Sequence, residues 1–149
     1  MYVVEILPGI WLGDEASAFD QEFISLKNIE CIINCSVDIG FLDNDMIKKK
    51  IRLSIRDNLT ADEIHKMYTH LHQTVDFIHE QIKNHNILIH CKVGIQRSAT
   101  VIVAYLIKYA DMQLKEAINA VKTKKPDIFR KGCNFEPALE LYTRTIRLS

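Results

Sequence analysis

A cysteine and an arginine six positions apart, Cys91 and Arg97, mark the stretch that most constrains the fold. Residues 86–89 before them form a compact apolar run of strand length, and residues 99–107 after them form a longer run of helical length. Strand, loop and helix in this order turn the N–H groups of the loop and of the helix start into one concavity, which binds tetrahedral oxyanions. A thiol placed there is pushed toward thiolate, the form that attacks. We therefore predict a phosphate-binding loop with Cys91 as its nucleophile.

The remaining sequence alternates short apolar runs with amphipathic segments of helical spacing. We expect two short strands within residues 3–12, and further strands at residues 29–34, 51–55 and 86–90. We expect helices at residues 14–27, 62–82, 98–109 and 114–121, and a last helix that carries Phe135, Leu139, Tyr142 and Ile146. This alternation predicts an α/β fold with a mostly parallel central sheet flanked by helices. The phosphate-binding loop then joins a strand to the central helix, and ligands bind beyond the carboxyl ends of the strands.

Length and charge restrict the class of protein. With 149 residues and no repeat or linker, the chain is expected to form one domain over residues 1–149. Its formal net charge of zero gives no global field that favours nucleic acid or an anionic membrane, so we expect neither as a partner. We interpret the basic runs at residues 48–50 and 122–125 as solvated surface. Because no apolar run has transmembrane length and the start does not resemble a signal peptide, we expect a cytoplasmic or nuclear protein.

The spacing of cysteines and histidines adds two expectations. Four cysteines are too few for the disulfide framework of a secreted scaffold, so we expect reduced thiols. Cys35 is either a core residue or the partner of Cys91 in a protective disulfide under oxidation. His65, His72 and His79 recur every seven residues, about 10 Å apart along a helix, which is too far for one metal ion. We interpret them as a polar helix face, and we expect neither a metal nor a cofactor.

At this point the chain resembles a known family. The string His-Cys-Lys-Val-Gly-Ile-Gln-Arg-Ser-Ala at residues 90–99 is similar to the signature of the cysteine-dependent protein tyrosine phosphatases, in particular their small, atypical dual-specificity branch. Residues 6–13, 32–36 and 121–126 fit the same branch in the correct order. The resemblance implies a dual-specificity phosphatase catalytic domain over residues 1–149. Residues 129–135 depart from the Pro-Asn and Gly-Phe pattern of many relatives, and this departure concerns surface or partner recognition rather than catalysis.

The signature assigns a role to each side chain of the loop. The planar guanidinium of Arg97 can bind two phosphate oxygens at once. Ser98 either donates to the sulfur and improves it as a leaving group, or caps the helix, or does both. Gly94 permits a conformation or a close approach that a side chain would obstruct. The resemblance gives His90 a supporting role rather than a proton-transfer role. The predicted phosphate-binding set is Lys92, Val93, Gly94, Ile95, Gln96 and Arg97.

A carboxylic acid must protonate the leaving oxygen, and two aspartates are candidates. Asp57 follows the expected strand at residues 51–55, on the kind of loop from which the family's acid comes. Asp62 is the alternative, although an aspartate at the start of a helix is already explained as a helix-terminal residue. In the expected mechanism Cys91 forms a cysteinyl-phosphate, and water then hydrolyses it with Asp57 as base. Gln96 either orients that water or is a solvated loop residue.

The chain has no room for the insertion that deepens the pocket of tyrosine-specific relatives. The resemblance therefore implies a shallow site for phosphotyrosine and for phosphoserine or phosphothreonine, with phosphorylated proteins as partners. Phosphoinositides and RNA 5′-triphosphate ends are the alternative substrates, although they favour a more basic loop than Lys92 alone provides. A non-catalytic phosphoprotein-binding module is the remaining hypothesis, and such modules usually lose the cysteine, the arginine or the acid.

Overall fold

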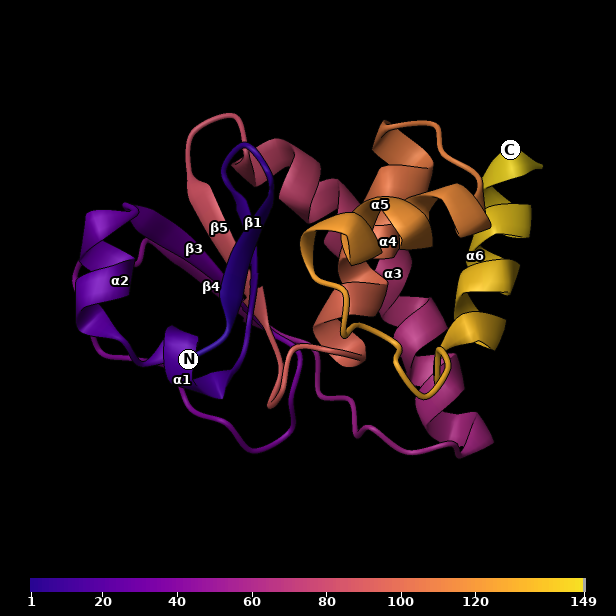
Figure 1. The fold of residues 1–149 in the computed structure, drawn as a ribbon, viewed down its shortest axis with the longest axis horizontal. Coiled ribbons are helices and arrows are strands. Elements are labelled where there is room, and N and C mark those ends of the chain that lie inside the picture. Colours follow the sequence, from indigo (N-terminus) through magenta and orange to yellow (C-terminus); the bar gives the residue numbers. More distant parts are fainter. Residues whose placement is uncertain (149) are drawn as a thin grey trace.

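A five-stranded sheet forms the middle of the fold, and helices cover both of its faces (Figure 1). The computed structural model describes residues 1–148. Its strands are β1 (Val3–Leu7), β2 (Ile10–Gly13), β3 (Ile29–Asn34), β4 (Lys49–Arg52) and β5 (Asn86–His90). Its helices are α1 (Glu15–Ala18), α2 (Gln21–Leu26), α3 (Ala61–Gln81), α4 (Arg97–Tyr109), α5 (Leu114–Lys124) and α6 (Glu136–Arg147). The short helices α1 and α2 lie on one face of the sheet, and α3 to α6 lie on the other.

The strand order β1-β2-β5-β3-β4 places β5 in the centre of the sheet. β5 runs parallel to both β2 and β3, and β3 runs parallel to β4, whereas β1 and β2 are antiparallel. The predicted α/β fold with a mostly parallel sheet is therefore confirmed. The register pairs His90 with Gly13 on one side and with Asn34 on the other, so three strands end side by side. Residues that follow these strands meet at one edge of the sheet, as expected for a ligand site.

Helix α4 is the centre of the larger core, because it is covered by the sheet and by three helices. All its residues from Ser98 to Ile107 are buried, which confirms the prediction of a central buried helix. On the other face of the sheet, Phe23 and Ile24 of α2 pack on Ile32 and Leu88. These two layers of apolar contact hold β5, and hence the loop after it, from both sides.

The predicted single helix over residues 14–27 is wrong, because the chain forms two short helices there. The Asp14 carboxylate accepts the Ser17 N–H at 2.9 Å and caps α1. The Asp20 carboxylate accepts the Phe23 N–H at 2.8 Å and starts α2. A second capping aspartate inside an apolar pattern of helical spacing therefore ended one helix and began another.

The predicted strand over residues 51–55 is displaced, because β4 covers Lys49–Arg52. Within residues 1–148, β4 pairs only with β3, and β3 ends at Asn34, the partner of Arg52, so the ladder has no further residues to bind. Leu53 and Ile55 follow the end of β4, and both side chains are buried in the core, whereas their neighbours Ser54 and Arg56 are exposed. Burial on one side of an extended loop thus produced the pattern of a strand.

Two interpretations of polar residues need correction. Residues 48–50 are exposed as expected, but Lys125 is fully buried, so the interpretation of the second basic run as solvated surface is wrong there. The histidines do not form one polar face. His72 packs against the ring of Tyr142 with centroids 4.9 Å apart, and His79 stacks on Tyr109 at 3.8 Å. His72 and His79 thus contribute to the packing of α3 against α6 and α4, whereas His65 is exposed. Among residues 1–148, no helix combines the length and the apolar character that crossing a membrane requires.

Replacement of Ile33 by alanine should destabilise the fold strongly, because Ile33 is buried in β3 between β5 and the helical layer. We expect Ile33→Ala to lower the free energy of unfolding by about 2 to 5 kcal/mol. Leu26→Ala is the matched control, because Leu26 is 71% exposed, and it should change that free energy by less than about 0.5 kcal/mol. Urea denaturation measures both, and equal effects would contradict this account of the core.

Candidate active site

Cys91 follows the central strand directly, and α4 begins six residues later at Arg97. The predicted arrangement of strand, loop and helix is therefore present. The Cys91 side chain lies at the base of the loop and is only 3% exposed. The Gly94 N–H donates to its Sγ at 3.2 Å, and the Ser98 hydroxyl lies 3.2 Å from the same atom. Both groups can donate to a sulfur that carries negative charge, which stabilises that charge.

Ser98 lies inside α4 rather than at its cap. The residue that precedes the helix is Gln96, and its side chain makes no capping hydrogen bond. The interpretation of Ser98 as an N-cap is therefore wrong, while its predicted proximity to the sulfur is present in the structure. Since Ser98 is fully buried, its hydroxyl is held beside Cys91 by the packing of α4.

The peptide groups of the loop are held from outside by three donors. The Lys92 carbonyl accepts the Glu15 N–H at 3.0 Å, and the Ile95 carbonyl accepts the Phe129 N–H at 3.0 Å. Between them, the Gly94 carbonyl accepts the Lys125 ammonium at 3.1 Å. In a planar trans peptide the C=O and the following N–H point in opposite directions. Each carbonyl that is held outward therefore turns the N–H of the following residue toward the inside of the loop. These inward N–H groups belong to residues 93, 95 and 96.

Gly94 is the position where the loop has no space for a side chain. Its φ of +84° lies in the left-handed region that glycine adopts readily. A Cβ atom at this position would lie 2.7 Å from the Gly13 carbonyl oxygen, which is closer than side-chain carbons approach. Both observations agree with the predicted need for glycine, since the loop passes directly over the end of β2.

Arg97 is oriented by a backbone carbonyl on the opposite side of the site. Its Nη1 donates to the Ile55 carbonyl at 2.9 Å. Its Nε is buried and has no hydrogen-bond partner within residues 1–148. A buried, unpartnered guanidinium N–H is costly unless it meets an acceptor, and a phosphate oxygen would supply one.

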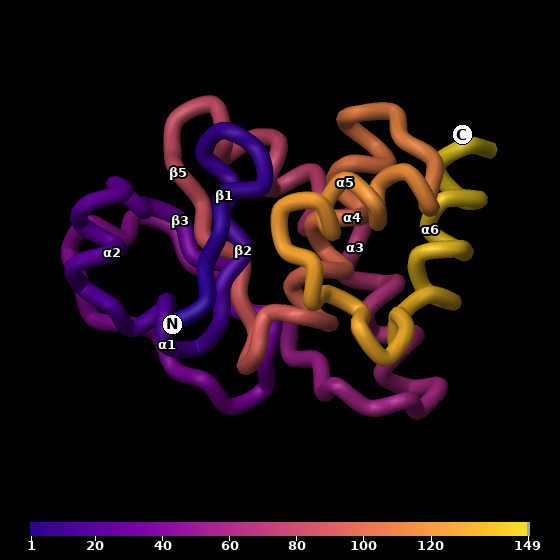
Figure 2. The backbone as a smooth tube through the Cα atoms, in the orientation of Figure 1, coloured from indigo at the N-terminus to yellow at the C-terminus, as the bar shows by residue number. Residues whose placement is uncertain are grey.

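Asp57 lies beside the loop, whereas Asp62 lies in the first turn of α3. Together with Ile95 and Gln96, Asp57 borders a cavity of about 250 Å³ whose other walls come from residues 130, 131 and 134. The Asn134 side-chain amide donates to its Oδ1 at 2.9 Å. The fold thus brings Asp57 to the rim of the phosphate loop, across the cleft from the start of α4. Figure 2 shows the loops after β4 and β5, and the one between α5 and α6, at the same lower edge of the view.

Gln96 and Asn134 form a link that the sequence did not predict. Gln96 is buried; its amide Nε2 donates to the Gly132 carbonyl at 2.8 Å, and its Oε1 accepts the Asn134 N–H at 3.0 Å. The interpretation of Gln96 as a solvated loop residue is therefore wrong. These contacts span more than 35 positions of the chain, so spacing gives no signal for them.

His90 is buried at the end of β5, and its Nδ1 lies 3.4 Å from the Cys91 carbonyl oxygen. Burial, with a smaller contribution from the Arg52 guanidinium, lowers the pKa of His90 to about 4. The imidazole is therefore neutral at pH 7. A neutral, buried ring fits the predicted supporting role better than proton transfer.

All four cysteines are free thiols. The Cys35 N–H donates to the His90 carbonyl at 2.8 Å, which places Cys35 next to the end of β5. Burial and the proximity of Cys91 raise the pKa of the Cys35 thiol well above its usual range. The disulfide between Cys35 and Cys91 under oxidation stays a prediction.

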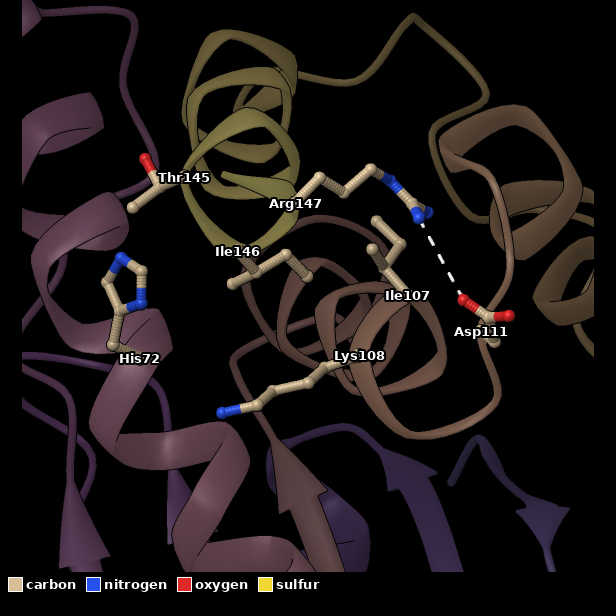
Figure 3. A pocket seen from close by; sticks show the side chains of 7 residues that line it. All are labelled: His72, Ile107, Lys108, Asp111, Thr145, Ile146 and Arg147. Carbon is tan, nitrogen blue, oxygen red and sulfur yellow. Dashed lines mark ion pairs between the residues drawn. The ribbon is translucent and has the colours of Figure 1, made fainter. Parts of the chain in front are cut away.

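A separate cavity lies at the other end of α4 (Figure 3). This cavity of about 660 Å³ is bordered by Lys108, near the end of α4, by His72 of α3 and by Arg147 of α6. Arg147 pairs with Asp111 at 3.9 Å across it. Because the helix separates it from Cys91 by about 16 Å, the cavity is not part of the phosphate loop. Within residues 1–148, no cluster of three or more His, Cys, Asp or Glu side chains is arranged to hold a metal ion.

Comparison with known proteins identifies the family and the fold of the chain. The family described as "Dual specificity phosphatase, catalytic domain" matches residues 10–145. The chain is 35% identical over 124 residues to MAP kinase phosphatase with leucine-rich repeats protein 3 of Dictyostelium discoideum, covering 83% of this chain and 14% of that protein. It is 33% identical over 143 residues to human Dual specificity protein phosphatase 16, covering 95% of this chain and 21% of that protein. The chain thus spans less than a quarter of the length of either relative.

Solved structures show the same fold at lower identity. Human DUSP28 superposes with a TM-score of 0.85 and 22% identity, covering 97% of this chain and 95% of that one. A mouse putative dual specificity phosphatase complexed with zinc tungstate superposes with a TM-score of 0.86 and 23% identity, covering 98% and 89%. The central sheet and its flanking helices are therefore a known arrangement.

The low pKa of His90 predicts how stability depends on pH. Between about pH 6.5 and 4, His90 is protonated in the unfolded chain but stays neutral in the folded chain. The stability that depends on neutral His90 is therefore fully present above pH 6.5 and is lost as the pH falls toward 4. We expect the free energy of unfolding to drop by about 3 kcal/mol more in the wild type than in His90→Asn over this range. Urea denaturation at several pH values measures the difference. His65→Asn, at an exposed histidine, should keep the wild-type slope, and a wild-type slope in His90→Asn would contradict the prediction.

Proposed function

The chain belongs to the dual specificity phosphatase catalytic-domain family, and on that basis we propose that residues 1–149 form a cysteine-dependent protein phosphatase domain. Its proposed substrates are phosphotyrosine and phosphoserine or phosphothreonine residues of proteins. The observation that supports this most directly is the position of the Cys91 sulfur, 3.2 Å from both the Gly94 N–H and the Ser98 hydroxyl, below a loop that ends at Arg97. Both groups can stabilise negative charge on the sulfur, as a thiolate nucleophile requires.

In the first step the Cys91 thiolate attacks phosphorus in line with the leaving oxygen. The S–P bond forms as the P–O bond to the alcohol or phenol breaks. Arg97 and the inward N–H groups of residues 93, 95 and 96 bind the equatorial oxygens and stabilise their charge. Asp57 protonates the departing oxygen, so that a neutral alcohol or phenol leaves. The products are the dephosphorylated residue and a cysteinyl-phosphate.

In the second step a water molecule attacks the cysteinyl-phosphate. Asp57 accepts a proton from this water, the P–S bond breaks, and inorganic phosphate leaves. The Ser98 hydroxyl stabilises the thiolate that departs from phosphorus. The mechanism requires no metal ion, because the Arg97 guanidinium and the loop N–H groups supply the positive charge that the transition state needs. A free thiol of this kind also fits the expected cytoplasmic or nuclear location, where cysteines stay reduced.

Substrate class is the part of the proposal that the site constrains least. The exposed side chains of Arg130 and Lys131 border the cavity beside Asp57, so the rim is more basic than Lys92 alone would make it. This observation supports phosphoinositides or RNA 5′-triphosphate ends as the second candidates. A panel of phosphotyrosine, phosphothreonine and phosphoserine peptides, phosphoinositide vesicles and 5′-triphosphate RNA separates these classes by the rate of phosphate release.

Replacement of Cys91 by serine should abolish hydrolysis of para-nitrophenyl phosphate, because an alcohol is far less nucleophilic than a thiolate at pH 7. We expect metal-free turnover by the reduced wild type in EDTA, and a loss of at least about 1,000-fold in Cys91→Ser. Cys31→Ala is the matched control and should retain turnover, because Cys31 is a core residue of β3 and burial raises its pKa to about 12. Absence of turnover by folded, reduced wild type on every substrate of the panel would favour the binding-module hypothesis instead.

Replacement of Asp57 by asparagine should remove the general acid while keeping the fold, because this side chain is exposed. We expect kcat to fall by about 100- to 10,000-fold for substrates with poor leaving groups, and less for para-nitrophenyl phosphate, whose phenolate leaves without help. Asp62→Asn is the matched control on α3 and should behave as the wild type. The reverse pattern would identify Asp62 as the acid.

A further inference from the structure

Lys125 is a buried cation that the proposed mechanism does not use. It follows α5, and its side chain is shielded completely from solvent. Lysine is almost never fully buried unless its ammonium is paired, because removing the charge from water is costly. Nearby groups must therefore compensate the cost of removing the Lys125 charge from water.

Three groups surround the Lys125 ammonium. The Gly94 carbonyl oxygen accepts from it at 3.1 Å, and the Asp127 carboxylate lies 3.4 Å away. On a further side the ammonium lies 3.9 Å from the centre of the Tyr2 ring, within the range of a cation–π interaction. The Asp127 carboxylate also lies next to the Tyr2 hydroxyl, and desolvation together with this carboxylate raises the pKa of that hydroxyl. Two of these partners enclose the cation, and the third belongs to the phosphate loop.

The contact with Gly94 determines the direction of one peptide group. Gly94 has a positive φ, a region in which glycine has wide conformational freedom. Its carbonyl is the one of the three outward carbonyls that is held by a side chain, while backbone N–H groups hold those of Lys92 and Ile95. Since C=O and N–H are antiparallel in a trans peptide, release of the Gly94 carbonyl would free the Ile95 N–H to turn out of the loop.

We propose that Lys125 is a positioning residue, which fixes the peptide between Gly94 and Ile95 so that the Ile95 N–H faces the bound phosphate. The inference rests on the proposed phosphatase function. In it, the buried Lys125 ammonium preorganises the N–H groups of the phosphate loop that bind the oxyanion. Lys125 does not touch the substrate, since the loop lies between them. Its contribution is therefore expected in phosphate affinity and in kcat, through one loop donor.

Lys125→Met removes the donor and keeps the length of the side chain. We expect kcat/KM to fall by about 10- to 100-fold, with kcat carrying most of the loss, because one of several oxyanion donors is misoriented. Lys125→Arg keeps both charge and donors and should restore activity to within about threefold of wild type. Lys124→Met removes the same charge from an exposed neighbour and should leave kcat unchanged. Wild-type kcat in a folded Lys125→Met protein would overturn the proposal.

Tungstate binding separates this inference from the proposed activity. In the Cys91→Ser background no turnover is needed, and calorimetry reports the affinity of the loop for a tetrahedral oxyanion. We expect Lys125→Met to weaken tungstate binding by about tenfold in this background, and Lys124→Met to leave it unchanged. Equal affinities would overturn the role of Lys125, even if the enzyme hydrolyses phosphoesters. A tenfold loss would support that role even if no phosphoester is hydrolysed.

If Lys125→Met does not fold, a measurement without any change at Lys125 tests the orientation of the Ile95 N–H on which the proposal depends. In the ¹H–¹⁵N spectrum of the Cys91→Ser protein, tungstate should shift the Ile95 amide proton downfield, because this N–H then donates to an anion. An Ile95 amide that does not respond, while its neighbours Val93 and Gln96 do, would show that its N–H does not face the anion. That result would overturn the proposal.

Discussion

The functional end of this fold depends on one constraint, the outward attachment of the carbonyl groups in the phosphate loop. Binding of an anion requires several N–H groups that converge on it, and a loop without other contacts does not keep its N–H groups aligned. Here the carbonyls of Lys92, Gly94 and Ile95 are bound by donors from three different parts of the chain. The N–H groups that follow these carbonyls are thereby turned inward, which is the preorganisation that electrostatic stabilisation requires.

The donors for these carbonyls connect the site to the whole fold. Glu15 belongs to α1 on one face of the sheet, while Lys125 and Phe129 come from the segment between α5 and α6 on the other. That segment is bound a second time, through Gln96 and Asn134, and Asn134 continues to Asp57. The proposed phosphate loop and the loop that carries Asp57 are therefore held in one hydrogen-bonded unit. A change on the segment between α5 and α6 acts on both.

The sequence predicted the parts of the site that are local. Cys91, Gly94, Arg97 and Ser98 lie within eight positions, and the strand before them and the helix after them are continuous apolar runs. Each of these patterns reflects a short-range requirement, such as space for a loop or burial of a helix on all sides. The errors arose where a distant partner decided the outcome. The strand at residues 51–55 ended early because β3 offered no further residues, and Gln96 was buried by the segment at residues 132–134.

The sequence by itself determined the fold class, the strand–loop–helix unit and the residue types that can attack and bind phosphate, because periodicity and spacing encode them directly. Only the tertiary structure decided which way the loop peptides face, which aspartate lies beside them, and why Lys125 is buried. Those properties depend on contacts between residues that are 30 or more positions apart in the chain, such as Lys125 with Gly94 and Asn134 with Asp57. No local pattern records such contacts, since they exist only after the sheet and its two helical layers have come together.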